Sequence, residues 1–278
     1  MSDTKTKQRM AVIGGGNIGS AIALGLVNSK RFSPDQIMVT RRRVALLKDL
    51  EKQGFVIEAD NCNAVRAAEI IVIAVEPGQL KGVLRQISPA LDPNRHIVFS
   101  IVSGAEIAQI KKILDTDVPV VRVMPNTAVA IGESMTCISV DDTDKSAMET
   151  ARSIFDSVGA TLVIEEDLMV PATALCACGI AFFFRAIRAA SQGGIEIGFH
   201  SREALQMAAQ TAKGAAALLN RQKNHPETQI DLVTTPRGCT IAGLNNMEHQ
   251  GFSSAMIRGI LTSAEKAEKL FHVNNGED

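Results

Sequence analysis

The chain has 278 residues, of which 46% are hydrophobic and 21% charged, so it is long enough to bury a sizeable core and to divide into two domains. Its formal net charge of −1 argues against the large positive potential with which nucleic-acid-binding proteins attract phosphates, and no nucleic-acid partner is expected. No apolar run approaches the roughly 20 residues of a membrane-spanning helix, so we expect no membrane association and a cytoplasmic location.

Short apolar runs alternate with amphipathic stretches over the first 165 residues. This alternation is typical of βα units that build a mostly parallel, doubly wound sheet. The helical stretches are expected at Val44–Gln53, Leu80–Leu91 and Ala105–Leu114. The strands are expected at Met10–Ile13, Ile37–Thr40, Phe55–Ile57, Ile70–Val75, Ile97–Ile101, Val118–Val123, Cys137–Val140 and Leu162–Ile164.

A GxGxxG motif, Gly14-Gly15-Gly16-Asn17-Ile18-Gly19, follows the first predicted strand and opens a helix. This is the context that a dinucleotide-binding fingerprint requires, so the sequence predicts a Rossmann-like domain. Gly14 is expected to make the tight turn, Gly16 to admit the pyrophosphate, and Gly19 to allow helix and strand to pack. The backbone N–H groups at the helix start, around Asn17 and Ile18, are predicted to bind the anion.

The second predicted strand runs into Thr40-Arg41-Arg42-Arg43. NAD-binding domains place a carboxylate here to bind the ribose 2′-hydroxyl, whereas guanidinium groups would pair with the 2′-phosphate of NADP. We therefore predict Thr40 and Arg41 as cofactor contacts and NADPH as the cofactor, with NADH possible. At least one of the three arginines is expected to be only solvated.

The predicted strand Ile70–Val75 leads into Glu76-Pro77, and Pro77 is expected to force a loop near the nicotinamide side of a bound cofactor. Val75 and Pro77 are therefore predicted cofactor contacts. Asn61, before this strand, could reach the adenine ribose or its phosphate, or could serve only as a turn residue.

After Glu166 the β-branched runs give way to long, Ala-rich helical segments at 168–198, 202–223, 240–250 and 252–271. They predict a second, all-helical dimerisation domain. We expect domains at 1–165 and 166–278. Small residues between Ala204 and Ala216 would allow close helix approach within one subunit or between two, and the scarcity of polar helix surface predicts a homodimer with intertwined helices.

Two further segments are too particular to be scaffold alone: residues 122–127, Arg-Val-Met-Pro-Asn-Thr, with Gly132-Glu133 after them, and the loop of residues 231–244. Together with the fingerprint, they resemble the pyrroline-5-carboxylate reductase family over nearly the whole chain. The resemblance implies hydride transfer from NAD(P)H to the C=N bond of a small cyclic imine, giving L-proline. It also implies dimers that can assemble into larger rings.

The resemblance also assigns residues. Met124, Pro125 and Asn126 would shape the nicotinamide pocket, although Asn126 could instead be only a capping residue. Backbone N–H groups in the turn Gly238–Thr240 could surround the substrate carboxylate. The hydroxyl of Thr240 would hydrogen-bond the ring nitrogen and help to stabilise or deliver its proton, which makes Thr240 the predicted catalytic residue. The predicted substrate-binding residues are Thr235, Gly238, Cys239 and Thr240.

The chain departs from the family pattern in several places, which include Ser253, where many members carry another residue. Arg237 and Cys239 replace a glycine and a threonine in the substrate loop, Glu76 replaces a lysine before Pro77, and residues 176–182 lack the usual proline and tyrosine. These departures leave two alternatives open. One is a related NADP-dependent reductase of another cyclic imine or of a β-hydroxyacid, for which Lys213 is the lysine to examine, and the other is a non-catalytic nucleotide-binding sensor.

The five cysteines are scattered, with no CxxC pair and no histidine at metal-ligand spacing. We therefore expect reduced thiols and no metal site. No base that could activate Cys176, Cys178 or Cys239 is discernible in the sequence, so small-residue packing is the preferred interpretation of these three positions.

Overall fold

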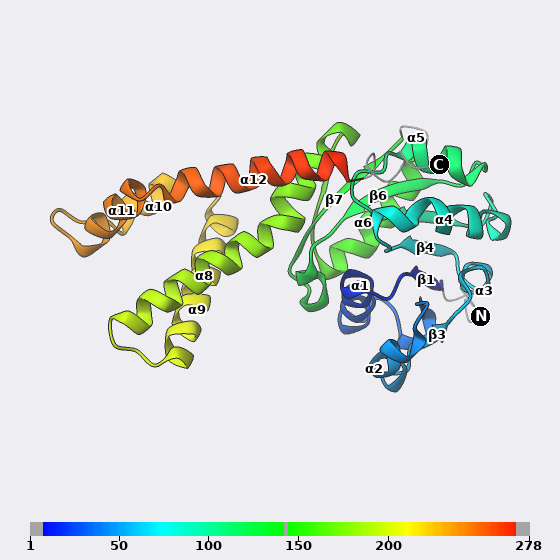
Figure 1. Cartoon of the computed structure of the whole chain (residues 1–278), viewed down its shortest axis with the longest axis horizontal. Helices are drawn as coiled ribbons and strands as arrows, with labels where there is room; N and C mark the ends of the chain where they lie inside the picture. Colours follow the sequence, from blue (N-terminus) through cyan, green and yellow to red (C-terminus); the bar gives the residue numbers. More distant parts are fainter. Residues whose placement is uncertain (1–7, 142–143, 271–278) are drawn as a thin grey trace, which may run out of the picture. The chain divides into compact units, whose positions relative to one another are not determined.

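The structure is a computed structural model that describes residues 8–141 and 144–270. The chain separates into two compact units. One unit comprises the chain up to Cys178 together with the segment from Ser263, and the other is Gly179–Thr262 (Figure 1). Each unit is described by itself below, and the domain boundary expected after residue 165 stays a prediction.

An eight-stranded sheet forms the centre of the first unit. The strand order is β3-β2-β1-β4-β5-β6-β7-β8, and neighbouring strands are parallel except for the antiparallel pair β6 and β7. The expected doubly wound, mostly parallel sheet is thus confirmed. The strands are β1 Met10–Ile13, β2 Ile37–Thr40, β3 Val56–Glu58, β4 Ile70–Ile73, β5 Ile97–Ser100, β6 Val120–Met124, β7 Ser134–Val140 and β8 Gly159–Val163.

Helices cover both faces of this sheet, so its central strands are buried on both sides. In β1, Met10 and Val12 join one hydrophobic core, which includes residues of α1 and α6, and Ala11 and Ile13 join another, which includes residues of α3, α4 and α5. This burial on both sides explains why the sequences of these strands are uninterrupted runs of apolar residues. The α-helices are α1 Asn17–Asn28, α2 Lys48–Lys52, α3 Asn61–Arg66, α4 Pro77–Ile87, α5 Ile107–Leu114 and α6 Lys145–Phe155.

Single turns of 3₁₀-helix complete the connections of the first unit. They are η1 Pro34–Gln36, η2 Val44–Leu47, η3 Ser88–Ala90, η4 Thr127–Ile131, η5 Asp156–Val158 and η6 Glu166–Leu168. The helix expected over Val44–Gln53 is therefore divided between η2 and α2. The helix expected over Leu80–Leu91 begins earlier, at Pro77, because a proline fits the first turn of a helix, where its missing N–H costs no hydrogen bond.

From Met169 onward the chain is helical. The elements are α7 Met169–Ala172, the π-helical turn η7 Thr173–Cys178, α8 Gly179–Glu196, α9 Ser201–Gln222, α10 Pro226–Leu232, α11 Cys239–His249 and α12 Phe252–Lys269. The four predicted helical segments are confirmed, apart from residue 271, which lies outside the described residues. The seven-residue α10 was not predicted, because so short a helix shows little periodicity.

The second unit leaves many large apolar side chains exposed. Helices α8 and α9 pack closely where a Cβ on Gly194 would lie 3.0 Å from that of Ala204, but Phe183, Phe184 and Leu232 are 62%, 61% and 72% exposed. Two helices alone cannot bury both of their faces. This unit therefore presents more apolar surface than an isolated domain normally does.

The expectation that no apolar run approaches membrane-spanning length is wrong. Among the described residues, the helical span Glu166–Glu196 is long and apolar enough, by length and composition, to cross a membrane. The reason is that residues 169–184 carry no charged side chain. This is weak evidence for a membrane, because core helices of soluble proteins pass the same test, and Met169, Ala172 and Ala174 are buried in the first unit.

Candidate functional site: a dinucleotide cleft and a separate glycine turn

The glycine-rich turn after β1 requires its glycines. Gly14 has φ +109°, a conformation that disfavours other residues, and a Cβ there would lie 2.4 Å from the Ala74 carbonyl oxygen. A Cβ on Gly19 would lie 2.1 Å from the Gly14 carbonyl oxygen. A Cβ on Gly16 would meet no atom within 4 Å, so this position faces open space at the N-terminus of α1. The fingerprint turn thus leaves space for the pyrophosphate of a dinucleotide to approach the backbone.

A cleft of about 690 Å³ lies next to this turn, in the first unit. Its walls contain six of the predicted cofactor residues. These are Gly14, Gly16, Thr40, Arg41, Asn61 and Val75. The cleft thus lies at the carboxyl ends of β1, β2 and β4, where open α/β sheets bind their ligands.

A chain of hydrogen bonds fixes the wall of the cleft formed by β2 and α3. The Thr40 hydroxyl donates to Asn61 Oδ1 at 2.6 Å, and Asn61 Nδ2 donates to Gln86 Oε1 at 2.8 Å. The Gly15 N–H donates to the Thr40 carbonyl oxygen at 2.7 Å. Asn61 is therefore the first residue of α3 and part of this network, and not only a turn residue.

The charge of the cleft is set by Arg41, Arg42 and Arg43, opposed by Glu76. Arg41 Nη1 donates to the Gly15 carbonyl oxygen at 3.0 Å, which holds this guanidinium beside the fingerprint turn. Arg42 and Arg43 are exposed. Three guanidinium groups at the end of β2 suit a phosphate better than a free ribose hydroxyl.

Sequence reasoning missed the wall supplied by α4. Gln79, Gly82, Val83 and Gln86 line the cleft, and Leu46 and Ala59 complete it. The usable signal was the position of α4 directly after β4, since ligands bind where strands end. The prediction that Pro77 forces a loop is wrong, because Pro77 is the first residue of α4, with Glu76 as its N-cap.

The other predicted cofactor residues are not among those that line the cleft. They are Asn17, Ile18, Gly19, Pro77, Met124, Pro125 and Asn126. Asn17 begins α1, Ile18 packs on the core, and Met124 joins a small cluster with Cys137 and Met169. Contact of these residues with a cofactor remains a prediction.

Asn126 makes two hydrogen bonds within the first unit. Its Oδ1 accepts the Ala128 N–H at 3.0 Å, which caps η4, and its Nδ2 donates to the Cys176 carbonyl oxygen at 3.3 Å. The capping role left open by the sequence is thus real. The second bond links the end of β6 to the π-helical turn.

Cys176 packs against the buried cluster that contains Cys137, a proximity that the sequence did not reveal because the two residues are far apart in the chain. A hydrogen bond from Cys137 lowers the pKa of Cys176 to about 7 despite its burial. The same hydrogen bond, with burial, raises the pKa of Cys137. The pKa of Cys178, unlike that of Cys176, is raised, because its thiol is partly buried.

The predicted substrate residues lie in the second unit, at the start of α11. Gly238 is the N-cap of α11, and its N–H donates to the Thr235 carbonyl oxygen at 2.9 Å. A Cβ on Gly238 would lie 2.6 Å from Thr235 Oγ1, so this turn also requires glycine. Cys239 and Thr240 form the first turn of α11, where backbone N–H groups have no intrahelical acceptor.

No group of three or more His, Cys, Asp or Glu side chains that could hold a metal ion occurs within the described ranges. Lys213, the lysine considered for a β-hydroxyacid oxidoreductase, is exposed on α9. The described contacts therefore give that alternative no specific support.

Residues 9–104 match the family model "NADP oxidoreductase coenzyme F420-dependent", and residues 166–270 match "Pyrroline-5-carboxylate reductase dimerisation". A Rossmann-like domain with this cleft, followed by a helical dimerisation domain, defines a class of two-domain nucleotide-dependent oxidoreductases. The chain is also 44% identical to pyrroline-5-carboxylate reductase 2 of Dictyostelium discoideum, over 96% of this chain and 95% of that protein. The chain belongs to the pyrroline-5-carboxylate reductase family.

The chain is also similar to one further relative and to two solved structures. Identity to pyrroline-5-carboxylate reductase 1 of Dictyostelium discoideum is 51% over 94% of this chain, but the chain spans only about half (50%) of that relative's length. A solved pyrroline-5-carboxylate reductase from Coxiella burnetii matches with a TM-score of 0.83 and 27% identity, over 95% of this chain and 98% of that one. The NADP-bound pyrroline carboxylate reductase of Plasmodium falciparum has the same fold, with a TM-score of 0.85 at 23% identity and the same coverage.

Proposed function

We propose that this protein reduces the C=N bond of 1-pyrroline-5-carboxylate with hydride from NAD(P)H, giving L-proline. The observation that carries the proposal is the 44% identity to a pyrroline-5-carboxylate reductase that extends over almost the full length of both chains. The fingerprint turn and its adjoining cleft supply the nucleotide site that such a reaction needs. The alternatives are reduction of another cyclic imine or a β-hydroxyacid reaction, and a nucleotide sensor without turnover.

NADPH is the proposed cofactor, with NADH as a weaker substitute. Support comes from the three arginines in the cleft wall and from the match to an NADP oxidoreductase model. A 2′-phosphate would gain charge-assisted hydrogen bonds from these guanidinium groups, whereas a 2′-hydroxyl would not. Thr40 and Asn61 would contribute polar atoms to the same wall.

The reduced nicotinamide supplies the hydride when the cofactor is bound, so the protein's own task is to hold and polarise the imine. The free N–H groups at the start of α11 suit the substrate carboxylate, and the helix dipole favours a negative charge there. The Thr240 hydroxyl would hydrogen-bond the ring nitrogen, where charge changes during reduction. Thr235 and Gly238 would keep the turn in shape through their hydrogen bond.

We also propose a homodimer formed through the helical domain. The match of residues 166–270 to a dimerisation model and the exposed apolar side chains of α8, α9 and α12 support it. Burying these side chains against a second copy would remove the apolar surface from water. Assembly of dimers into a larger ring, and a cytoplasmic location, are proposed from the family resemblance and the composition respectively.

NADPH oxidation, followed by absorbance, tests the proposal. The five-membered imine, its six-membered homologue and a β-keto acid would be offered separately to the full-length protein. We expect turnover on the five-membered imine to exceed that on the other two. Preference for another compound would identify a related reductase, and cofactor binding without turnover on any of them would indicate a sensor.

A further inference from the structure

We propose that the Glu76 carboxylate is a second determinant of cofactor preference, which favours the free ribose 2′-hydroxyl of NADH and opposes the 2′-phosphate of NADPH. Glu76 lines the cleft beside the fingerprint turn, and within the described ranges it is the only acidic residue that does so. The inference deepens the proposed function, because it rests on the proposed binding of NAD(P)H. It does not depend on which imine is reduced.

Glu76 belongs to a row of cleft-lining residues along α4. Glu76, Gln79, Val83 and Gln86 all line the cleft, and they follow one another at intervals of three or four residues. Residues with this spacing lie on the same face of a helix. The face of α4 that borders the cleft therefore carries one negative charge, that of Glu76, and no positive charge.

Hydrogen bonds join this face of α4 to the end of β2. Gln86 Oε1 accepts the Asn61 side-chain amide at 2.8 Å, and Asn61 Oδ1 accepts the Thr40 hydroxyl at 2.6 Å. Thr40 is the last residue of β2, and doubly wound domains bind the ribose 2′ position of the adenosine half at the end of this strand. The α4 face and the three arginines after Thr40 therefore border the same part of the cleft.

The end of β4 also brings Glu76 next to the fingerprint turn. A Cβ on Gly14 would lie 2.4 Å from the Ala74 carbonyl oxygen and 3.0 Å from Val75 Cγ1, and Glu76 is the next residue. Strand β1 lies between β2 and β4, so the ends of β2 and β4 are about 10 Å apart, twice the spacing of neighbouring strands. Long side chains from both strand ends can reach one ribose across that distance.

The Glu76 carboxylate is available for a ligand. Glu76 is exposed and is the N-cap of α4, but its side chain makes no capping hydrogen bond. Its carbonyl oxygen accepts the Gln79 N–H at 2.9 Å, so the backbone alone begins the helix. Among the residues that the structure describes, none forms a hydrogen bond or an ion pair with this carboxylate.

The two walls of the cleft act on the ribose 2′ position in opposite directions. A carboxylate accepts a hydrogen bond from a free 2′-hydroxyl, as in NAD-binding domains, but it repels a 2′-phosphate. The guanidinium groups of Arg41, Arg42 and Arg43 favour the phosphate. A cleft that contains both kinds of group discriminates less than one with the arginines alone, so we expect the wild type to bind both cofactors.

Calorimetric titration of the full-length protein with NADPH and with NADH tests the proposal. Glu76→Gln keeps the shape of the side chain and removes its charge. We expect it to raise the ratio of the Kd for NADH to the Kd for NADPH by about 10-fold, because the hydroxyl loses a charged acceptor and the phosphate is no longer repelled. A ratio that stays unchanged or falls would overturn the proposal.

Glu149→Gln is the matched control. The Glu149 side chain is 65% exposed on α6, a helix that contributes no residue to the cleft wall, so this variant should keep the wild-type ratio. Circular dichroism shows whether both variants are folded. An equal rise of the ratio in both variants would mean that net charge and not the position of Glu76 sets the preference, and would contradict the proposal.

Two fragments of the cofactor test which ribose Glu76 faces. Adenosine 2′,5′-bisphosphate and AMP represent the adenosine half with and without the 2′-phosphate. We expect Glu76→Gln to raise the ratio of the Kd for AMP to the Kd for the bisphosphate by about 10-fold, as for the whole cofactors. A rise with the whole cofactors but not with the fragments would place Glu76 at the nicotinamide half and would overturn its assignment to the 2′ position.

These titrations contain no imine, which separates this proposal from the proposed function. If the protein turns over none of the imines, the proposed function fails, while the binding ratios still decide the role of Glu76. If the five-membered imine is turned over and the ratios do not respond to Glu76→Gln, only the role of Glu76 fails. A protein that binds neither cofactor would contradict both proposals.

Discussion

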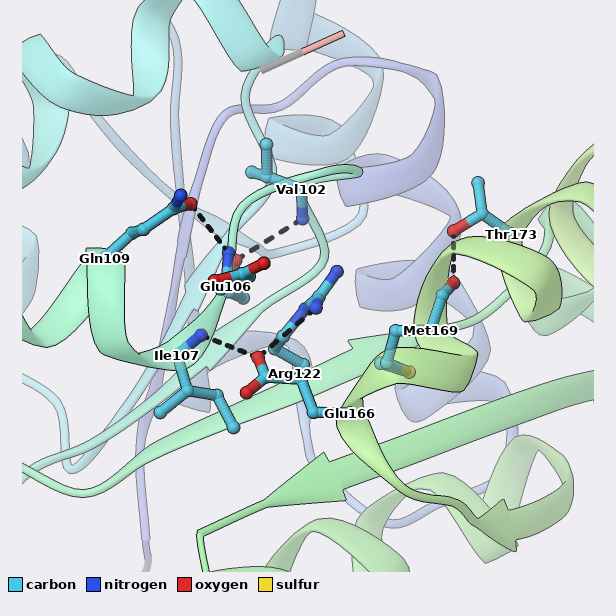
Figure 2. A network of polar contacts seen from close by, with 9 residues as sticks. Val102, Glu106, Ile107, Gln109, Arg122, Glu166, Met169 and Thr173 are labelled. Atoms are coloured by element: carbon cyan, nitrogen blue, oxygen red, sulfur yellow. Dashed lines mark hydrogen bonds and ion pairs between the residues drawn. The ribbon is translucent and has the colours of Figure 1, made fainter. Parts of the chain in front are cut away.

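Arg122 and Glu166 form an ion pair that joins β6 to the segment after β8. Arg122 Nη1 lies 3.2 Å from Glu166 Oε1, and the same oxygen accepts the Ile107 N–H at 2.7 Å (Figure 2). The Arg122 side chain is only 3% exposed, and its Nη2 has no protein partner among the described residues. One carboxylate therefore compensates a buried guanidinium and also the first N–H of α5.

Removing the Glu166 carboxylate should destabilise the folded protein. We expect Glu166→Ala to lower the free energy of unfolding by about 2–4 kcal/mol, because it removes the ion-pair partner of the buried Arg122 and leaves only the weaker attraction of Glu106. Denaturation followed by circular dichroism measures it, since the chain lacks tryptophan and tyrosine for fluorescence.

Asp49→Ala is the matched control, because Asp49 pairs with Lys52 where both side chains are exposed, at 90% and 76%. That change should cost less than about 1 kcal/mol. Equal effects of the two substitutions would contradict a special role for the Arg122 and Glu166 pair.

Much of the sheet could be predicted because burial on both faces leaves a plain apolar run, as in β1 and β4. The start of β7 could not. It begins at Ser134, three residues before the predicted Cys137, and includes the buried polar residues Ser134 and Thr136. Their hydroxyl groups lie 3.1 Å apart and hydrogen-bond each other, so the burial is satisfied by a contact that composition does not reveal.

The candidate site also has parts that the sequence predicts and parts that it does not. The fingerprint turn could be predicted because its glycines are close together in sequence: a side chain at Gly14 or Gly19 would clash, and Gly16 leaves open space. Gln86 could not, because only the packing of α4 beside α3 brings it to Asn61. The packing of Cys176 on the cluster that contains Cys137 depends likewise on the return of the chain from β8 through η6 and α7, which sequence spacing does not show.

Cofactor preference should depend on Arg41. We expect Arg41→Ala to lower the ratio of kcat/KM for NADPH to that for NADH by about 10-fold or more, the value of one charge-assisted hydrogen bond. Some loss with NADH is also expected, since Arg41 holds the Gly15 carbonyl oxygen. Steady-state kinetics with both cofactors measures the ratio.

Arg66→Ala is the control for that series, because Arg66 is an exposed arginine on α3 that is not among the cleft-lining residues. Its ratio should equal that of the wild type. An Arg41→Ala enzyme that keeps the wild-type ratio would remove Arg41 from recognition of the 2′-phosphate.

The hydroxyl of Thr240 should matter for turnover and not for cofactor binding. We expect Thr240→Val to lower kcat by about 10- to 100-fold, the value of one hydrogen bond to a charged group. The dissociation constant for NADPH, measured by calorimetry, should be unchanged. Thr240→Ser keeps the hydroxyl and should retain most of the turnover; if Val and Ser behave alike, the hydroxyl has no part in the reaction.

His96 should make stability depend on pH. Burial, and then the charge of Arg95, lower its pKa below the usual 6.5, against weaker opposing effects of Asp92 and nearby carbonyl groups. Its Nδ1 accepts the Asp92 N–H at 2.8 Å, which requires the neutral ring. The unfolded chain therefore binds the proton more readily, and the folded state should lose stability as pH falls below about 6.5, until the folded pKa is passed.

Urea unfolding between about pH 7.5 and pH 5 measures this dependence. In His96→Asn, the amide oxygen can still accept the Asp92 N–H but cannot titrate, so the part of the slope due to His96 should vanish. Identical slopes for wild type and variant would show that His96 does not contribute.

Arg237 should store backbone strain in the turn before α11. Its φ is +62°, in the left-handed region that costs a non-glycine residue about 1–2 kcal/mol, and it follows Pro236 in the turn closed by the Gly238 N–H. Arg237→Gly should relieve this strain, partly offset by the greater freedom of glycine in the unfolded chain. We expect a net gain of up to about 1 kcal/mol in urea unfolding. Arg258→Gly, in the interior of α12, should instead lose about 1 kcal/mol, because glycine disfavours a helix. If Arg237→Gly and Arg258→Gly lower the free energy of unfolding equally, Arg237 does not strain the turn.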